Sequence, residues 1–311
     1  MGSAGTWNAA NGDVTSTLPA SQLRDPTSLL TPEQSQTVEQ WARQIQSLVN
    51  TAVDQGGPAG RRVKNWLNGV WLGHPVHPAL TDVPIGAWVT GALLDVVDAQ
   101  GAADAAMTVG VLASVPTALA GLADWADAGD EPRRVGFVHA ALNSVGLGFM
   151  VGSLFARRAD QRGLGIILST TGLALASFSA WLGGELVYRL GTSVSRIAFQ
   201  PSVPDFQVVA RADELEDGKL KGVEAHVEGA SVPIVLLKRG ATIMALSGTC
   251  THWGGPLAEG KLLDGDCVQC PWHGTQFRMA DGSVLQGPGT IQARVFEARI
   301  QNGNVEVRSR D

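Results

Sequence analysis

At 311 residues, the chain is long enough for two domains of ordinary size. It has 29 acidic against 23 basic residues and a formal net charge of −6, which argues against nucleic-acid binding because that function favours a basic face. The charged residues are unevenly distributed along the chain, so we expect two domains of different kinds.

The N-terminal region, residues 1–57, is polar, and residues 1–30 contain no apolar segment of the kind found in secretory signals. One helix is predicted within it, because Thr31 can cap a helix that has Pro32 at its first position. Apolar residues then recur at helical spacing as a single stripe, made of Val38, Trp41, Ile45, Leu48, Val49 and Val53. The stripe is compatible with packing on its own protein, on a membrane surface or on another chain.

Residues 58–198 are predicted to form a four-helix transmembrane domain. Three stretches contain no Asp, Glu, Lys or Arg, namely residues 105–123, 135–156 and 163–184. Each can cross a bilayer, because a helix needs about 20 residues to span a hydrocarbon core of about 30 Å. A fourth stretch, residues 79–97, is interrupted by Asp82 and Asp95. Frequent small residues favour close helix packing in lipid. The alternative is a soluble Ala/Gly-rich helical domain, and no internal repeat is obvious.

Basic residues beside the predicted spans indicate the orientation in the membrane. Seven lie on the side shared by the N-terminus, the second loop and the C-terminal domain: Arg61, Arg62, Lys64, Arg133, Arg134, Arg189 and Arg196. Three lie on the opposite side: Arg157, Arg158 and Arg162. Since cytoplasmic loops carry an excess of Lys and Arg, we predict an integral protein of a bacterial cell membrane whose C-terminal domain lies in the cytoplasm.

Residues 199–311 are predicted to form an all-β domain. The stretch VPIVLLKRGATIMALS contains two β-rich runs around Arg239-Gly240, and ARVFEARIQNGNVEVR contains two more around Asn302-Gly303, a dipeptide typical of tight hairpin turns. Residues 250–277 lie between these hairpins and contain all 3 cysteines and two of the 6 histidines of the chain. We therefore expect these side chains on loops between strands, where they can converge.

The spacing of these residues is typical of a site for two metal ions. Cys250 and His252 form a C-x-H motif, and Cys270 and His273 form a C-x-x-H motif. A zinc finger usually places a cysteine pair before a histidine pair, whereas here each loop supplies one thiolate and one imidazole. This arrangement suits a Rieske [2Fe–2S] centre, in which one iron is bound by two cysteines and the other by two histidines. Zinc remains the alternative. Cys267 is best interpreted as a plain thiol, because its C-x-x-C partner Cys270 is needed as a ligand.

The two motifs, CTHWGGPL and CPWHGTQF, resemble the cluster-binding loops of the Rieske family over roughly residues 203–309. The resemblance implies a domain of stacked antiparallel β-sheets. It also implies that Cys250 and Cys270 bind the buried iron, and that His252 and His273 bind the iron nearer to solvent.

Four positions in these loops depart from the Rieske proteins of respiratory cytochrome bc complexes. Gly255 and Trp272 occupy the places of their disulfide cysteines, and a missing disulfide fits a reducing compartment. Thr275 and Phe277 occupy the places of a serine and a tyrosine that donate hydrogen bonds near the cluster. Because fewer donors stabilise the reduced cluster less, we predict a reduction potential in the lower part of the Rieske range of about −150 to +300 mV.

The membrane half resembles a bacterial four-helix membrane family of unknown function over roughly residues 70–195, on the motifs WLGHPVHPALTDVPIGAW, HAALN and AWLGGELVYRLG. Five polar residues lie near the same end of the predicted spans: His74, His77, Asp82, His139 and Asn143. Ionisable groups at such depth are costly and often functional. His74, His77 and His139 are therefore candidates for binding haem b or a quinone, and the alternative is a purely structural role.

These observations together predict a membrane-anchored Rieske protein that passes single electrons between a membrane or soluble donor and an acceptor. Its partners would be a redox protein or a quinone together with membrane lipid. A self-contained oxygenase would need a mononuclear iron bound by two histidines and a carboxylate, but no histidine follows His273 and only His226 precedes the motifs in this domain. The alternatives are a redox-sensing or assembly protein, or the electron-supply component of an oxygenase system.

Overall fold

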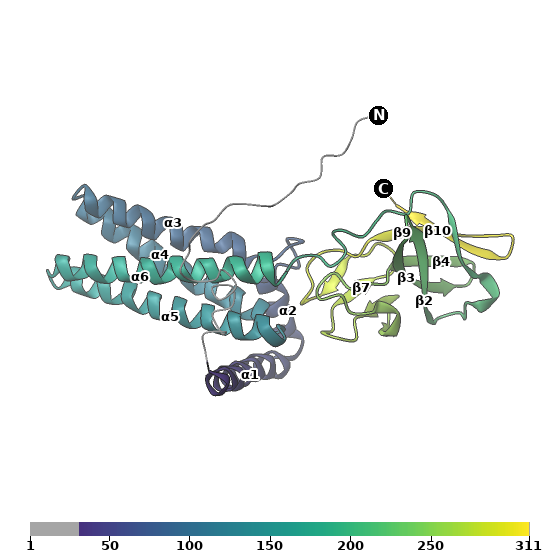
Figure 1. Cartoon of the computed structure of the whole chain (residues 1–311), viewed down its shortest axis with the longest axis horizontal. Helices are drawn as coiled ribbons and strands as arrows, with labels where there is room; N and C mark the ends of the chain where they lie inside the picture. Colours follow the sequence, from purple (N-terminus) through teal and green to yellow (C-terminus); the bar gives the residue numbers. More distant parts are fainter. Residues whose placement is uncertain (1–30, 311) are drawn as a thin grey trace, which may run out of the picture.

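Helices and strands occupy separate halves of the computed structural model (Figure 1). It describes residues 31–310, so residues 1–30, for which we predict no secretory signal, lie outside the described residues. The helices are α1 (Pro32–Gln55), α2 (Gly57–Asn68), α3 (His77–Val96), α4 (Gln100–Trp125), α5 (Asp130–Arg158) and α6 (Arg162–Gly184), which continues as a π-helix over Glu185–Arg189. The prediction of a helical bundle followed by an all-β domain is confirmed.

The helices α3 to α6 are each long and apolar enough to cross a membrane. On α4, most of the large apolar side chains other than Met107 point outward, and Leu112 and Val115 are 66% and 55% exposed. The buried face of α4 consists mainly of small residues, among them Ala103, Gly110, Ser114, Thr117 and Ala120. This arrangement, with small residues between the helices and large apolar ones outside, suits a bundle surrounded by lipid.

The α3–α4 and α5–α6 hairpins make the same contacts at positions 62 residues apart in the sequence. In the first hairpin, the Nδ1–H of His77 donates to the carbonyl of Thr117 at 2.9 Å. In the second, the Nδ1–H of His139 donates to the carbonyl of Ser179 at 2.8 Å. Both partners lie 40 residues after their histidine. The membrane bundle is therefore built from two copies of one helical hairpin.

Other features recur at the same spacing. The turn residues Asp98 and Asp160 both have a left-handed backbone, with φ of 56° and 57°. Identical residues at this spacing include His77 and His139, Leu80 and Leu142, Gly86 and Gly148, Gly110 and Gly172, and Gly121 and Gly183. The identical residues are scattered along the hairpins, which explains why no repeat is obvious in the sequence.

Four charged side chains form an ion cluster at the end of the bundle farthest from the strands. Arg157 of α5 contacts Asp95 of α3 at 2.5 Å and Asp104 of α4 at 2.9 Å, and Arg162 of α6 contacts both carboxylates. The side chains of Arg157 and Asp95 are only 1% and 5% exposed. Mutual neutralisation allows these charges to lie within an otherwise apolar bundle, and the cluster joins all four helices.

The predicted N-terminal helix is present as α1, with Thr31 as its N-cap in a reciprocal capping box with Gln34. Its inner face packs beside the end of α5 nearest the strands (Figure 1). Part of the apolar stripe nevertheless faces outward, because Trp41 and Leu48 are 55% and 70% exposed. Packing on its own protein therefore accounts for only part of the stripe.

The strands form two antiparallel sheets, of six strands in the order β1-β10-β9-β4-β3-β2 and of four in the order β5-β6-β7-β8. Their bounds are β1 (Gln207–Arg211), β2 (Leu220–Val227), β3 (Ala230–Arg239), β4 (Thr242–Ser247), β5 (Lys261–Leu263), β6 (Cys267–Gln269), β7 (Gln276–Arg278), β8 (Val284–Gln286), β9 (Val295–Gln301) and β10 (Asn304–Ser309). Both predicted hairpins are present, and Asn302 and Gly303 have φ of 53° and 79° in the β9–β10 turn.

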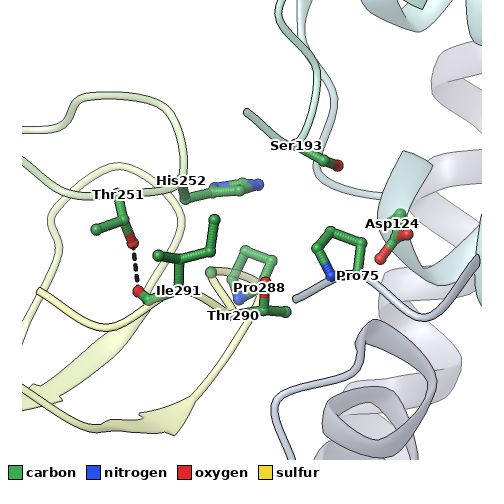
Figure 2. Close-up of a pocket in the computed structure, with 9 residues that line it drawn as sticks. Pro75, Asp124, Ser193, Thr251, His252, Pro288, Thr290 and Ile291 are labelled. Atoms are coloured by element: carbon green, nitrogen blue, oxygen red, sulfur yellow. Dashed lines mark hydrogen bonds between the residues drawn. The ribbon is translucent and has the colours of Figure 1, made fainter. Parts of the chain in front are cut away.

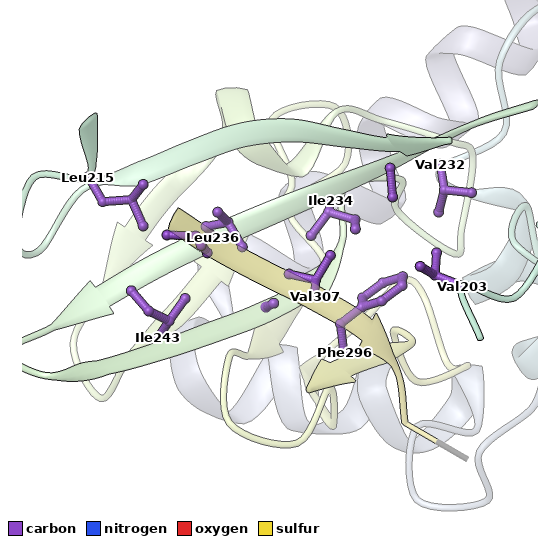
Figure 3. Close-up of a cluster of buried hydrophobic side chains, with 11 residues drawn as sticks. Val203, Leu215, Val232, Ile234, Leu236, Ile243, Phe296 and Val307 are labelled. Carbon is purple, nitrogen blue, oxygen red and sulfur yellow. The ribbon is translucent and has the colours of Figure 1, made fainter. Parts of the chain in front are cut away.

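The β domain contains two apolar cores. The core of the larger sheet (Figure 3) contains buried side chains from several of its strands, including Ile234, Leu236, Phe296 and Val307. The second core lies between the two sheets and includes Leu246, Leu257, Val268, Phe277 and Met279. Cys250 and Cys270 belong to this second core, so the cysteine motifs are attached to well-packed strands.

Candidate metal centre

The two cysteine-histidine motifs lie on loops with the same backbone hydrogen bonds. In the first loop, the Cys250 amide donates to the carbonyl of Gly255 at 2.9 Å, and the Gly254 amide donates to the carbonyl of Cys250 at 3.0 Å. The second loop repeats the pattern from Cys270 to Thr275 at 2.8 Å and from Gly274 to Cys270 at 3.1 Å. Gly254 and Gly274 have φ of +84° and +78°, a conformation that glycine adopts without strain.

The loops bring the two thiols together and the two imidazoles together. The side chains of Cys250 and Cys270 are in hydrogen-bond contact and almost fully buried. The rings of His252 and His273 meet edge to face, with centroids 5.1 Å apart and an interplanar angle of 88°. Both histidines are half-buried. The cysteines therefore lie deeper than the histidines.

Backbone amides lie near both sulfur atoms. The amides of His252 and Trp253 act to lower the pKa of Cys250, and those of Trp272 and His273 act to lower the pKa of Cys270. The bond from the Cys250 thiol is the main cause that lowers the pKa of Cys270 to about 6, whereas the same contact raises the pKa of Cys250. Amides directed at sulfur favour a thiolate, which is the form that binds metal.

The histidines are held in the neutral form that binds metal. Burial is the main cause that lowers the pKa of His252 to about 3, and the nearby positive groups of His273, Lys64 and Arg196 act in the same direction. Burial also lowers the pKa of His273. The Nδ1 atom of His252 is buried and has no hydrogen-bond partner among residues 31–310. An unpartnered buried nitrogen costs about 1–3 kcal/mol, and a metal bond would remove this cost.

The space around the sulfur atoms also fits a metal centre. A Cβ added at Gly255 would come within 2.7 Å of Cys270 Sγ and 3.1 Å of the Trp272 ring, so a side chain there would crowd the site. Two thiols on one side and two imidazoles on the other suit a two-iron cluster better than a zinc ion.

Three other residues of the predicted site region have defined places. Cys267 lies in β6 as a buried free thiol, and burial raises its pKa. Thr275 is fully buried, and its hydroxyl accepts a hydrogen bond from the Gly289 amide at 2.9 Å. Phe277 is fully buried in the second core. The Thr275 hydroxyl is therefore held beside the second loop, and the Phe277 ring packs in the apolar core.

The candidate histidines of the membrane half serve as hairpin contacts. His77 and His139 donate to the backbone carbonyls described above, and Asn143 donates to Nε2 of His139 at 3.1 Å. His74 is exposed and its Nδ1–H donates to the carbonyl of Pro75, while Asp82 is exposed. These bonds give His77 and His139 a structural role in the two hairpins.

The cluster loops face the end of the helical bundle. A cavity of about 20 Å³, room for about one water molecule, lies beside His252 between the two halves of the chain. Figure 2 shows Pro75, Asp124 and Ser193 on the helical side of this cavity, opposite His252, Pro288 and Ile291. Motif spacing could not reveal Asp124 or Ser193, because these residues belong to the bundle and to the linker.

Polar contacts hold the two halves together around the cavity. The Gly287 amide donates to Asn65 Oδ1 of α2 at 3.0 Å. Arg196, in the linker after α6, donates its backbone amide to the carbonyl of Thr251 at 3.1 Å and stacks over Trp253 at 4.6 Å. The cluster loops are thus positioned by the membrane half as well as by their own sheets.

Comparisons with known proteins agree with this geometry. The Rieske [2Fe-2S] domain family matches residues 205–297. Ferredoxin CarAc of Metapseudomonas resinovorans is 32% identical over 99 residues, which are 32% of this chain and 89% of that ferredoxin. The chain belongs to the Rieske family. A second family, the predicted membrane proteins DUF2231, matches residues 73–196.

Further relatives of the Rieske domain include other electron carriers. The anthranilate 1,2-dioxygenase ferredoxin subunit of Burkholderia cepacia is 36% identical over 83 residues, covering 27% of this chain and 75% of that subunit. A solved complex of reduced oxygenase and oxidized ferredoxin in carbazole 1,9a-dioxygenase contains a chain that is 32% identical; the match covers 33% of this chain and 92% of that one, with a TM-score of 0.30. The two ferredoxin relatives, from Metapseudomonas resinovorans and Burkholderia cepacia, support an electron-transfer role for the Rieske domain, whose family binds a [2Fe–2S] cluster.

Proposed function

We propose that this protein carries single electrons through a [2Fe–2S] cluster held beside a membrane surface. Cys250 and Cys270 would bind one iron, and His252 and His273 would bind the other. The observation that carries the proposal is the pair of matched loops, which bring two thiols and two imidazoles to one place. The bound cluster would supply one-electron chemistry, and neutral histidines in place of two thiolates would make its reduction easier.

The partner that fits best is a redox protein. Trp272 is 57% exposed beside His273, so this side of the site is open to a second protein. The cavity beside His252, at about 20 Å³, is too small for a quinone ring. Relatives that are ferredoxins of dioxygenase systems point the same way, toward supplying electrons to an oxygenase or a similar acceptor. The proposal includes neither haem nor quinone: the Nδ1–H groups of His77 and His139 hold the two hairpins together, and Nε2 of His139 accepts from Asn143.

We place the Rieske domain in the cytoplasm. Arg61 and Arg62 are exposed at the end of the bundle that adjoins this domain. At the opposite end, Arg157 is buried in the ion cluster, which leaves Arg158 as an exposed cation there. Counting exposed basic residues alone therefore increases the excess of Lys and Arg on the Rieske side over the opposite side. By the positive-inside rule, the side with this excess is the cytoplasmic one.

Redox titration of the purified full chain, followed by electron paramagnetic resonance, tests the cluster. We expect a reversible one-electron signal that is lost in His252→Ala and Cys250→Ser. Two controls should keep it: His226→Ala, at an exposed histidine of β2, and Cys267→Ser, at the buried thiol of β6. A colourless protein that contains zinc, or a full signal in His252→Ala, would contradict the proposal.

A further inference from the structure

The helix α1 has three different faces. Its inner face carries Ala42 and Gln46, which are buried against the protein. One flank is apolar and exposed; it follows helical spacing through Trp41, Ile45, Leu48 and Ala52, and we call it the apolar flank. The other flank is polar and exposed, and comprises Gln36, Gln40, Arg43, Ser47 and Asp54. A helix packed at the edge of a soluble protein would be expected to have two polar flanks.

Hydrogen bonds fix α1 at the level where the spans end. Gln46 Nε2 donates to the carbonyls of Trp125 and Ala128 at 2.8 and 2.9 Å, and Asn50 Nδ2 donates to the carbonyl of Ala126 at 3.2 Å. These carbonyls belong to the end of α4 and the turn before α5. The helix therefore lies beside the membrane-water boundary of the four spans, on the Rieske side.

The same bonds indicate which way the apolar flank points. At about 100° of rotation per residue, Gln46 and Asn50 lie between the centre of the inner face and the polar flank. The turn that they bind is therefore on the polar side of α1. The apolar flank points away from this turn, toward the lipid-facing surface of the spans.

A second exposed apolar group lies on and just after the next helix. Trp66 of α2 and Trp71 are each 60% exposed and stack with centroids 6.5 Å apart and an interplanar angle of 18°. Tryptophan is enriched where protein meets lipid headgroups. Arg61 and Arg62 are exposed on the same helix and could contact anionic headgroups.

We propose that α1 and the Trp66–Trp71 pair form an interfacial anchor that binds the lipid leaflet on the Rieske side, with the apolar flank of α1 buried at the headgroup boundary. The inference rests on the proposed function only in requiring that α3 to α6 cross the membrane. The contacts of α1 with the α4–α5 turn hold the helix against the spans, and its apolar flank points away from that turn toward their lipid-facing surface. Lipid is therefore the occupant that the geometry favours, ahead of a second copy of the chain.

Environment-sensitive bimane labels on single introduced cysteines in the full chain test the anchor. Leu48→Cys reports the apolar flank, and its neighbour Ser47→Cys reports the polar flank as a matched control. The three native cysteines are at most 3% exposed, and labelled wild-type protein provides the blank. Each variant is reconstituted into vesicles that contain phosphatidylglycerol. Quenching is measured with lipid nitroxides near the headgroup and with aqueous iodide.

The Leu48→Cys label should be quenched by the lipid nitroxide roughly twofold or more over the Ser47→Cys label, with iodide giving the reverse order. Equal quenching of both labels by iodide, without lipid quenching, would overturn the anchor. Shielding of the Leu48→Cys label from both quenchers would also overturn it, in favour of a protein partner or a second copy.

A third label separates failure of the anchor from failure of membrane embedding. Leu112→Cys, on the outward face of α4, should be quenched by a nitroxide deep in the acyl chains. If this label is quenched and the Leu48→Cys label is not, only the anchor is wrong. If neither is quenched by lipid, the membrane location in the proposed function is wrong as well. Should Leu48→Cys fail to fold, Ala52→Cys and Asp54→Cys repeat the comparison on the same two flanks.

Discussion

Gly255 of the first cluster loop lies against Cys270 and Trp272 of the second. A Cβ at this position would come within 2.7 Å of Cys270 Sγ, so the close approach of the two loops depends on a residue without a side chain. In the bc-type pattern a disulfide crosses here, and in this chain Gly255 instead packs directly against the Trp272 ring. Tight packing replaces the covalent link between the loops.

Gly255→Ala is expected to reduce cluster content strongly, because the added methyl group would displace the sulfur of Cys270. Iron and acid-labile sulfide per chain measure the effect, together with the electron paramagnetic resonance signal. Gly240→Ala is the matched control in the β3–β4 turn: its backbone is left-handed, with φ of +58°, but an added Cβ meets nothing within 4 Å. It should cost about 1 kcal/mol of stability and keep the cluster. Equal cluster content in both variants would show that the close approach is unimportant.

At the residue scale, the spacing of the motifs predicts which side chains converge, and the structure brings the rings of His252 and His273 together. Cys250, His252, Cys270 and His273 are separated by few residues within each loop, so local spacing restricts their geometry. Lys64 and Arg196, which lie near His252, could not be found in this way. They reach the site only because the bundle and the Rieske domain pack together, and no local pattern encodes that contact.

At the scale of the helices, the ion cluster at the far end of the bundle explains how charged residues are tolerated between apolar helices. In the sequence, Asp95 counts against a transmembrane helix over residues 79–97, because a charge in an apolar helix is costly. The structure supplies the reason why the helix tolerates it: Asp95 contacts Arg157 and Arg162 from two other helices. The partners are about 60 residues away in the sequence, so the periodicity of one helix could not reveal them.

Arg157→Ala should destabilise the bundle by about 3–5 kcal/mol, because it leaves the buried Asp95 carboxylate with only one cation. Arg162→Ala should cost less, since the Arg162 side chain is 22% exposed and water can replace part of its interaction. Unfolding of the detergent-solubilised protein by denaturant, followed by circular dichroism, measures both. A smaller effect for Arg157→Ala than for Arg162→Ala would contradict the importance of the buried pair.

The amphipathic helix shows the limit of periodicity at the scale of an element. Helical spacing correctly predicts α1, its N-cap and its apolar residues. It does not distinguish residues that face the protein from those that face outward. Val49 and Val53 lie toward the protein, whereas Trp41 and Leu48 face outward. The helix has this orientation because Gln46 and Asn50 form hydrogen bonds with the end of α4 and the turn after it.

Over the whole molecule, the Rieske domain is docked on the bundle with its histidine side toward the membrane half. Its position depends on the Asn65 contact, the linker around Arg196 and the loop over residues 287–291. The fold of each half follows from its own pattern of apolar residues. The way the two halves dock cannot be predicted from these patterns, because the docking depends on single polar contacts at sites without any sequence motif.

Asn65→Ala removes the hydrogen bond from the Gly287 amide and should loosen this docking. We expect faster hydrogen exchange at residues 287–291, with the cluster signal unchanged because no ligand is altered. Arg62→Ala, at an exposed position on the same helix, is the control and should leave exchange unaffected. Unchanged exchange in Asn65→Ala would indicate that the other contacts are sufficient.

The 62-residue spacing of the two hairpins has a consequence for the charges of the helical half. Asp95 and Arg157 occupy equivalent positions in the two hairpins, yet they contact each other. In a symmetric pair of identical hairpins this position would face its own counterpart, and two like charges would repel. Because both hairpins belong to one chain, their sequences can differ, and an acid in one is neutralised by a base in the other.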